Sequence, residues 1–122
     1  MTPFGQKLRQ LRQERGLKLA AMAKALNVSS AYLSALEHGK RGRPSWRVIQ
    51  AVITYFNIIW DDAEELIRLS RLSHPKITID TAGLTPAATE MANLLAINVA
   101  KMAEADIQAM LVILRSATPK TT

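Results

Sequence analysis

The first forty residues are divided into short apolar segments by residues that readily adopt a left-handed backbone. Gly16, Asn27 and Gly39 each follow a segment in which apolar residues recur at helical spacing. Glycine or asparagine at such a position is typical of a helix C-terminus. We therefore expect three short helices, over residues 4–15, 19–26 and 30–38. Helices this short are stable only when they pack on one another, so a compact helical domain is predicted.

The helical pattern continues to about residue 72, after a loop at residues 39–44. That loop is indicated by two glycines, a proline and three cations in GKRGRP. A fourth helix follows, and its expected buried stripe consists of Trp46, Ile49, Val52, Ile53 and Phe56. A fifth helix begins near Asp61, where carboxylates suit the positive end of the helix dipole, and it carries Leu66, Ile67, Leu69 and Leu72. Trp46 and Trp60 bracket the fourth helix and are expected in the core or in a domain contact.

The last third of the chain predicts a different arrangement. Ser73-His74-Pro75 interrupts the helical pattern, and residues 76–80 alternate with period two, which indicates a short strand or an extended linker. Thr85 followed by Pro86 is a helix start, predicting a helix to about Met102. A final helix is expected from about Glu104 to Arg115. The expected fold class is all-α: five helices over residues 1–73, a short extended segment, and a C-terminal helical hairpin within residues 76–116.

The composition argues against several functional classes. Without cysteine there is no disulfide framework, thiolate metal site or cysteine nucleophile. The acids at 61, 62, 64 and 65 lack partner ligands and are interpreted as a helix start, so no metal site is expected. His74 is interpreted as a solvated loop residue. The sequence has no glycine-rich phosphate-binding loop. It also has no evident set of side chains that could act as a nucleophile, its general base and the group that orients the base, so we expect neither an enzyme nor a cofactor.

The apolar segments give no sign of export or membrane insertion. The N-terminal residues lack a basic stretch followed by an apolar run, so no secretory signal is expected. The most apolar region, residues 91–114, is interrupted by polar residues that a bilayer-spanning helix would not tolerate. A cytoplasmic protein without membrane contact is therefore the expectation.

Positive charge is concentrated in the first half of the chain. Residues 1–60 hold ten Lys and Arg against two acids, a net charge of +8, whereas residues 61–122 hold six bases against eight acids, a net charge of −2. Charge of this kind indicates a polyanionic partner for the first half only. Charge alone also fits a surface that is merely well solvated.

Residues 16–43, GLKLAAMAKALNVSSAYLSALEHGKRGR, carry a more specific pattern. Its features are a small Ala23, the turn over residues 26–29, the apolar pair Leu33 and Leu36, and the ending Glu-x-Gly-Lys at residues 37–40. In this combination the segment resembles the lambda-repressor-like (Xre-type) helix-turn-helix family. The resemblance extends less closely over residues 4–72, and it implies a five-helix DNA-binding domain of that family.

The resemblance implies that helix 30–38 enters the major groove of double-stranded DNA. Base edges would face Ser30, Ala31, Ser34 and Ala35, while Lys40, Arg41 and Arg43 would contact phosphates. Small side chains cannot form the bidentate hydrogen bonds that Arg or Gln make with base edges. More of the recognition is therefore left to DNA shape and to the loop. The implied DNA-binding residues are Lys18, Ser29, Ser30, Ala31, Tyr32, Ser34, Ala35, Lys40, Arg41 and Arg43.

The same resemblance bears on Lys18 and Glu37. Many members of the family have a Gln at the start of the second helix, whereas this chain has Lys18 and Leu19, and Lys18 would supply a phosphate contact instead. Glu37 is expected to pair with Arg12 of the first helix and so to be structural. From its position at a helix end, His38 is expected to complement the negative end of the helix dipole, and the alternative is contact with a phosphate.

The C-terminal helices carry more apolar surface than two isolated helices can cover. This surface is interpreted as a homodimer interface, a lid on the first domain, or a groove for a partner protein. Dimerisation is favoured because two copies one DNA turn apart read a palindrome. The residues expected at the dimer interface are Leu94, Ile97, Ile107, Met110, Leu111 and Leu114. The resulting hypothesis is a dimeric transcriptional repressor; the alternative is an antitoxin or anti-activator that acts through protein contacts.

Overall fold

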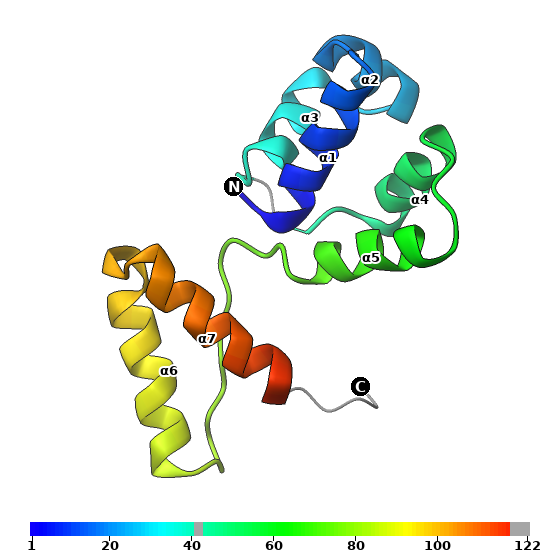
Figure 1. Cartoon of the computed structure of the whole chain (residues 1–122). Coiled ribbons are helices and arrows are strands. Elements are labelled where there is room, and N and C mark those ends of the chain that lie inside the picture. Colours follow the sequence, from blue (N-terminus) through cyan, green and yellow to red (C-terminus); the bar gives the residue numbers. More distant parts are fainter. Residues whose placement is uncertain (41–42, 118–122) are drawn as a thin grey trace. The chain divides into compact units, whose positions relative to one another are not determined.

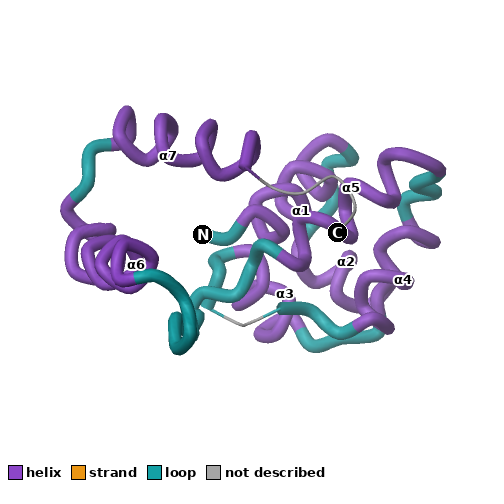
Figure 2. The backbone as a smooth tube through the Cα atoms, turned by 90° about the horizontal axis from the view of Figure 1, so that it is seen from below, coloured by secondary structure: helices purple, strands orange, loops and turns teal. Residues whose placement is uncertain are grey.

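The structure, a computed structural model, describes residues 1–40 and 43–117. All the regular secondary structure in these two ranges is helical, as Figures 1 and 2 show. The chain forms two compact units, Met1–Ile77 and Thr78–Thr122. None of the helices within the described ranges has the length and apolar character needed to cross a membrane.

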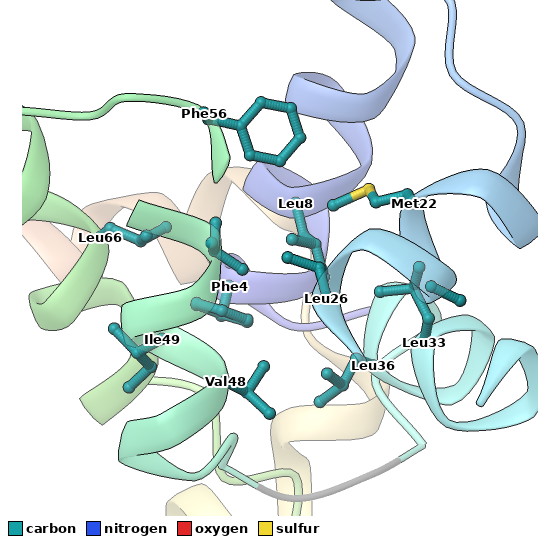
Figure 3. Close-up of a cluster of buried hydrophobic side chains, with 12 residues drawn as sticks. Phe4, Leu8, Met22, Leu26, Leu33, Leu36, Val48, Ile49, Phe56 and Leu66 are labelled. Carbon is teal, nitrogen blue, oxygen red and sulfur yellow. The ribbon is translucent and has the colours of Figure 1, made fainter. Parts of the chain in front are cut away.

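The first unit contains five helices around one apolar core. They are α1 (Pro3–Glu14), α2 (Leu19–Leu26), α3 (Ser30–Glu37), α4 (Trp46–Tyr55) and α5 (Trp60–Arg71). In this unit α1 packs on α3 and α5, α2 packs on α3 and α4, and α4 packs on α5. Figure 3 shows side chains from all five helices meeting in the core. Its buried apolar members are Phe4, Leu8, Met22, Ala23, Leu26, Leu33, Leu36, Val48, Ile49, Val52, Phe56 and Leu66.

Four of these helices end in the same hydrogen-bonded turn. Gly16, Asn27, Gly39 and Asn57 have positive φ values of 61°, 57°, 71° and 52° and follow α1, α2, α3 and α4. In each turn, the N–H of the following residue reaches back five positions to a helix carbonyl, as from Lys40 to Ala35 at 2.9 Å. This geometry satisfies carbonyls that the helix leaves without partners. The three left-handed ends expected from the sequence are confirmed, and Asn57 adds a fourth.

Three large apolar side chains that the sequence pattern led us to expect as covered are exposed. Trp46, the first residue of α4, is 55% exposed, and Trp60, the first residue of α5, is 82% exposed. Leu72, the residue that follows α5, is exposed as well. All three lie at a helix terminus. Neither tryptophan therefore lies in the core, and a domain contact for them stays a prediction.

The second unit begins with an extended segment and continues with helices. No strand forms among the described residues, so residues 76–80 are a linker rather than a strand. α6 (Pro86–Asn98) starts at Thr85, whose Oγ1 accepts a hydrogen bond from the Ala88 N–H at 3.2 Å. A short 3-10 helix, η1 (Val99–Lys101), ends α6 earlier than the expected Met102, and α7 (Glu104–Ala117) follows. Neither α6 nor α7 contains a buried residue.

Candidate nucleic-acid interface

The two faces of α3 differ sharply in burial. Leu33, Leu36 and Glu37 are buried, whereas Ser30 and Ala31 are exposed and Ser34 and Ala35 are half buried. The four outward residues are small and uncharged, and they follow one another along the helix at spacings of one, three and one residues, so that they share one side of it. One face of α3 therefore anchors it in the core, and the opposite face leaves room for a close approach by another molecule.

Ser29 and Tyr32, two of the residues predicted to bind DNA, have a structural role at the start of α3. Ser29 caps α3, since its Oγ accepts a hydrogen bond from the Tyr32 N–H at 3.0 Å. Such a bond satisfies one of the backbone donors that a helix start leaves without a partner. The Tyr32 side chain is half buried and packs against the core. Both residues thus fix the start of the helix whose outer face is exposed.

Exposed cationic side chains both precede and follow α3 in the sequence. Lys18 precedes α2, and Lys40 and Arg43 follow α3; all three side chains are exposed. Lys18 occupies the position before α2 but makes no side-chain capping bond. The predicted site residue Arg41 lies outside the described residues. Lys24 of α2 and Arg47 of α4 add exposed positive charge that the site prediction omitted.

Negative charge is almost absent from the same part of the sequence. Between residues 16 and 45 the sole acid is Glu37, which is 2% exposed. Its carboxylate accepts hydrogen bonds from Arg12 of α1, from Nε to Oε2 at 2.8 Å and from Nη2 to Oε1 at 3.0 Å. The expected pairing of Glu37 with Arg12 is confirmed. A surface built from α2, α3 and the residues after α3 therefore presents only positive formal charge.

The Arg12 guanidinium also ties α1 to the segment that leads into α2. Its Nη1 donates to the Leu17 carbonyl at 3.1 Å, in addition to its two bonds with Glu37. The hydrogen bond with the Glu37 carboxylate raises the pKa of Arg12, and partial burial opposes that shift. One side chain thus joins α1, α3 and the approach to α2, which holds α2 and α3 in a fixed relation.

His38 completes the end of α3. Its Nδ1 lies 2.8 Å from the Ser34 carbonyl oxygen, so an Nδ1–H donates to a carbonyl in the last turn of its own helix. Its side chain is exposed. This contact agrees with the expected role at the negative end of the helix dipole.

Sequence reasoning missed three residues that hold the helices in place. Arg15 was counted with the positive charge, but its Nη2 donates to the Phe56 carbonyl at 3.0 Å and its guanidinium lies 5.0 Å from the centre of the Phe56 ring. Ser73 binds the start of α1, and Gly5 lies against the end of α3. A glycine inside a helix was the one signal for Gly5, because glycine is unfavourable there without a packing reason.

Two similar proteins each match about half of this chain. RghRB of Bacillus subtilis (strain 168), described as an uncharacterized HTH-type transcriptional regulator, is 37% identical over 62 residues, covering 51% of this chain and 45% of that protein. DdrOP3 of Deinococcus deserti, also an HTH-type transcriptional regulator, is 43% identical over 60 residues, covering 49% and 46%. The matches therefore span a little under half the length of these relatives.

A solved structure and a family description complete the comparison. A chain of the SinR protein/SinI protein complex overlaps 92% of this chain and 94% of its own length, with a TM-score of 0.46 and 18% identity. Residues 3–66, more than half of the chain, match the helix-turn-helix domain family. The chain belongs to the helix-turn-helix domain family.

Proposed function

We propose that this protein is a sequence-specific, double-stranded DNA-binding transcriptional regulator that inserts α3 into the major groove. The observation that carries the proposal is the outward face of α3: small, uncharged and accessible on a helix whose other face is locked in the core. An α-helix fits the major groove only if its outer face is unobstructed. Relatives described as transcriptional regulators support the same function.

Each group of residues has a distinct part in this proposal. Ser30, Ala31, Ser34 and Ala35 face base edges, where a serine hydroxyl donates or accepts and an alanine methyl contacts thymine. Lys18, Lys40, Arg41 and Arg43 contact phosphates, which positions the domain without reading sequence. Ser29 and Tyr32 hold the start of α3 and border the groove. Because the base-facing side chains are small, the shape of the DNA contributes much of the specificity.

The second unit, in this proposal, joins two copies into a dimeric repressor in the cytoplasm. Of the residues assigned to the interface, Leu94, Ile97 and Leu114 are exposed, and Ile107, Met110 and Leu111 are half buried. A groove of about 390 Å³ on this unit is lined mainly by apolar side chains, including Met91, Leu94 and Met110. A second copy would cover such a surface and would present two α3 helices to a palindromic site.

The same apolar surface favours a second candidate function. An antitoxin or anti-activator would use α6 and α7 to capture a different protein, with DNA binding secondary. The two candidates differ in what DNA they select. A regulator enriches one palindromic region, whereas an interaction protein shows only unselective, salt-sensitive binding.

Selection of bound fragments from genomic DNA, followed by mobility-shift titration at several salt concentrations, tests the proposal. We expect one enriched palindromic sequence. Replacing Lys40 and Arg43 together with Ala should weaken binding to every sequence and reduce the slope of log K against log salt by about 1.8, at about 0.9 for each phosphate that the variant no longer neutralises. Replacing Ser34 with Ala should change the preferred sequence and leave the slope unaltered.

A matched control is Arg68→Ala. This cation belongs to the same unit but pairs with Glu65 on α5, at 2.7 Å between Nη2 and Oε1. It should not change DNA affinity. If no sequence is enriched, or if the Lys40 and Arg43 variant binds as the wild type does, the proposed interface is wrong.

A further inference from the structure

Ser73, which lies just after α5, is bonded to the first turn of α1. Its Oγ accepts a hydrogen bond from the Phe4 N–H at 2.9 Å and donates one to the Leu69 carbonyl at 2.6 Å. The Ser73 side chain is buried, and Phe4 is the second residue of α1. The first N–H groups of a helix have no partner within that helix. Ser73 therefore supplies a cap to α1 from a position 69 residues away in sequence.

The same first turn of α1 lies against the end of α3. A Cβ added to Gly5 would collide with the Leu36 carbonyl oxygen and would lie 3.0 Å from the Glu37 carbonyl oxygen. A Cβ added to Gly39 would lie only 2.8 Å from the backbone nitrogen of Thr2. Backbone thus meets backbone at two places, with no side chain between them. The start of α1 and the end of α3 are therefore in direct backbone contact.

The turn that ends α3 differs from the other three turns in what lies against it. After α1, α2 and α4, the residue that follows the left-handed turn is apolar and packs against the core: Leu17, Val28 and Ile58. After α3 that residue is the exposed Lys40. An apolar contact normally accompanies such a turn and stabilises it. At the end of α3, the backbone of Met1 and Thr2 against Gly39 takes its place.

We propose that Ser73 is a positioning residue for the DNA interface: by fixing the first turn of α1 against the end of α3, it sets the direction in which Lys40 meets a phosphate. This inference rests on the proposed DNA-binding function. Without the Ser73 hydroxyl, the Phe4 N–H loses its partner in a buried place, and the first turn of α1 moves or frays. Gly39 and Lys40 then lose the surface that supports their turn.

The test compares Ser73→Ala with Ser70→Ala. Ser70 is equally buried, but its Oγ bonds only to the Ile67 carbonyl of its own helix, at 2.6 Å. The first readout is hydrogen exchange in the protein without DNA. In Ser73→Ala, exchange of the Lys40 amide, which is bonded to Ala35, should accelerate about tenfold more than exchange of the Val28 amide, which closes the equivalent turn after α2. Ser70→Ala should change both amides alike.

The second readout is the salt dependence of DNA binding, measured well below the unfolding temperature of each variant. Ser73→Ala should lower the slope of log K against log salt by about 0.9, because Lys40 no longer neutralises its phosphate, and Ser70→Ala should not. General destabilisation reduces the active fraction but leaves this slope unchanged. Ser73→Thr keeps the hydroxyl and should restore the slope. If Ser73→Ala fails to fold, Ser73→Cys takes its place. A thiol accepts a hydrogen bond only weakly, so amide exchange at Lys40 and the salt slope should change in the same direction but by less.

The outcomes separate the two proposals. If the wild type lacks salt-dependent DNA binding, the proposed function fails and the role of Ser73 in DNA binding fails with it. If the wild type binds DNA, but Ser73→Ala keeps its slope and shows no selective exchange at Lys40, Ser73 only stabilises the domain. That result overturns the inference and leaves the proposed function standing.

Discussion

Arg12 of α1 and Glu37 of α3 form a bidentate ion pair across the interface of the two helices, with N–O distances of 2.8 and 3.0 Å. The carboxylate is almost fully buried, and the guanidinium is mostly covered. A charge in such a place is tolerated only when its partner is present. This pair therefore fixes the helix that carries the proposed base-facing residues, and it also removes the one negative charge from that part of the surface.

Glu37→Ala should destabilise the protein strongly. The substitution leaves the Arg12 guanidinium without its counter-charge in a partly buried position, which costs about 3 kcal/mol of unfolding free energy. Urea denaturation, followed by helical circular dichroism, measures the change. A loss below about 1 kcal/mol would mean that α1 and α3 are held together by their apolar contacts alone.

The control for that measurement is the exposed pair Glu65 and Arg68. Glu65→Ala should have little effect, because exposed ion pairs are screened by solvent and contribute little. The hydrogen bond with Arg68 lowers the pKa of Glu65. Any stability from this pair is therefore present at neutral pH and is lost as pH falls through the lowered pKa. Both variants are compared at pH 7, where the contribution of the Glu65 and Arg68 pair is fully present.

Gly5→Ala tests the close approach of α1 and α3, because the sign of its effect on unfolding free energy depends on that approach. Helix propensity alone predicts that alanine stabilises a helix interior by about 1 kcal/mol relative to glycine. At Gly5 the added methyl would collide with the Leu36 carbonyl, which is backbone and cannot rotate away. We expect a net destabilisation of about 1 to 3 kcal/mol by urea denaturation. An alanine variant more stable than the wild type would show that the helices separate at little cost.

The contrast between Gly16 and Gly5 shows what the sequence could predict. Gly16, Asn27 and Gly39 end helices by their own backbone preference, so their role could be inferred locally. The role of Gly5 depends on α3, and that of Ser73 depends on a residue at the other end of the domain. Neither contact exists until the helices cross, so no local pattern could indicate it.

The two tryptophans show a second limit of the sequence pattern. Apolar periodicity identifies which side of a helix is apolar, and for Leu66 and Val52 that side is the core. Periodicity does not show whether a neighbouring helix extends far enough to cover a residue at the terminus. Trp46 and Trp60 each begin a helix, and each is exposed. The outward face of α3 could be predicted because the residues that mark its buried face belong to the same short helix.

Trp60→Asn should stabilise the protein. Trp60 has a φ of 53°, a left-handed conformation that costs about 1 to 2 kcal/mol for residues with a Cβ, and Asn tolerates it better than most. Because the side chain is exposed, little buried apolar area is lost on replacement. We expect a gain of about 0.5 to 1 kcal/mol in unfolding free energy. Trp46→Asn is the matched control: Trp46 is also exposed and begins a helix, but its φ is not positive, so it should bring no gain.

Ile97→Asp tests the proposed dimer without disturbing either helix of the second unit. Ile97 lies on α6 and is 69% exposed, so a carboxylate there remains solvated in an isolated chain. In a dimer that buries this residue, the same carboxylate would be taken out of water without a partner, at a cost of several kcal/mol. Sedimentation velocity should therefore show a dimer for the wild type and a monomer for the variant, with unchanged helical content. Leu84→Asp is the control, because Leu84 is an exposed leucine of the same unit outside the proposed interface. A variant at Ile97 that sediments as the wild type does would place the dimer contact elsewhere, and a monomeric wild type would favour capture of a different protein.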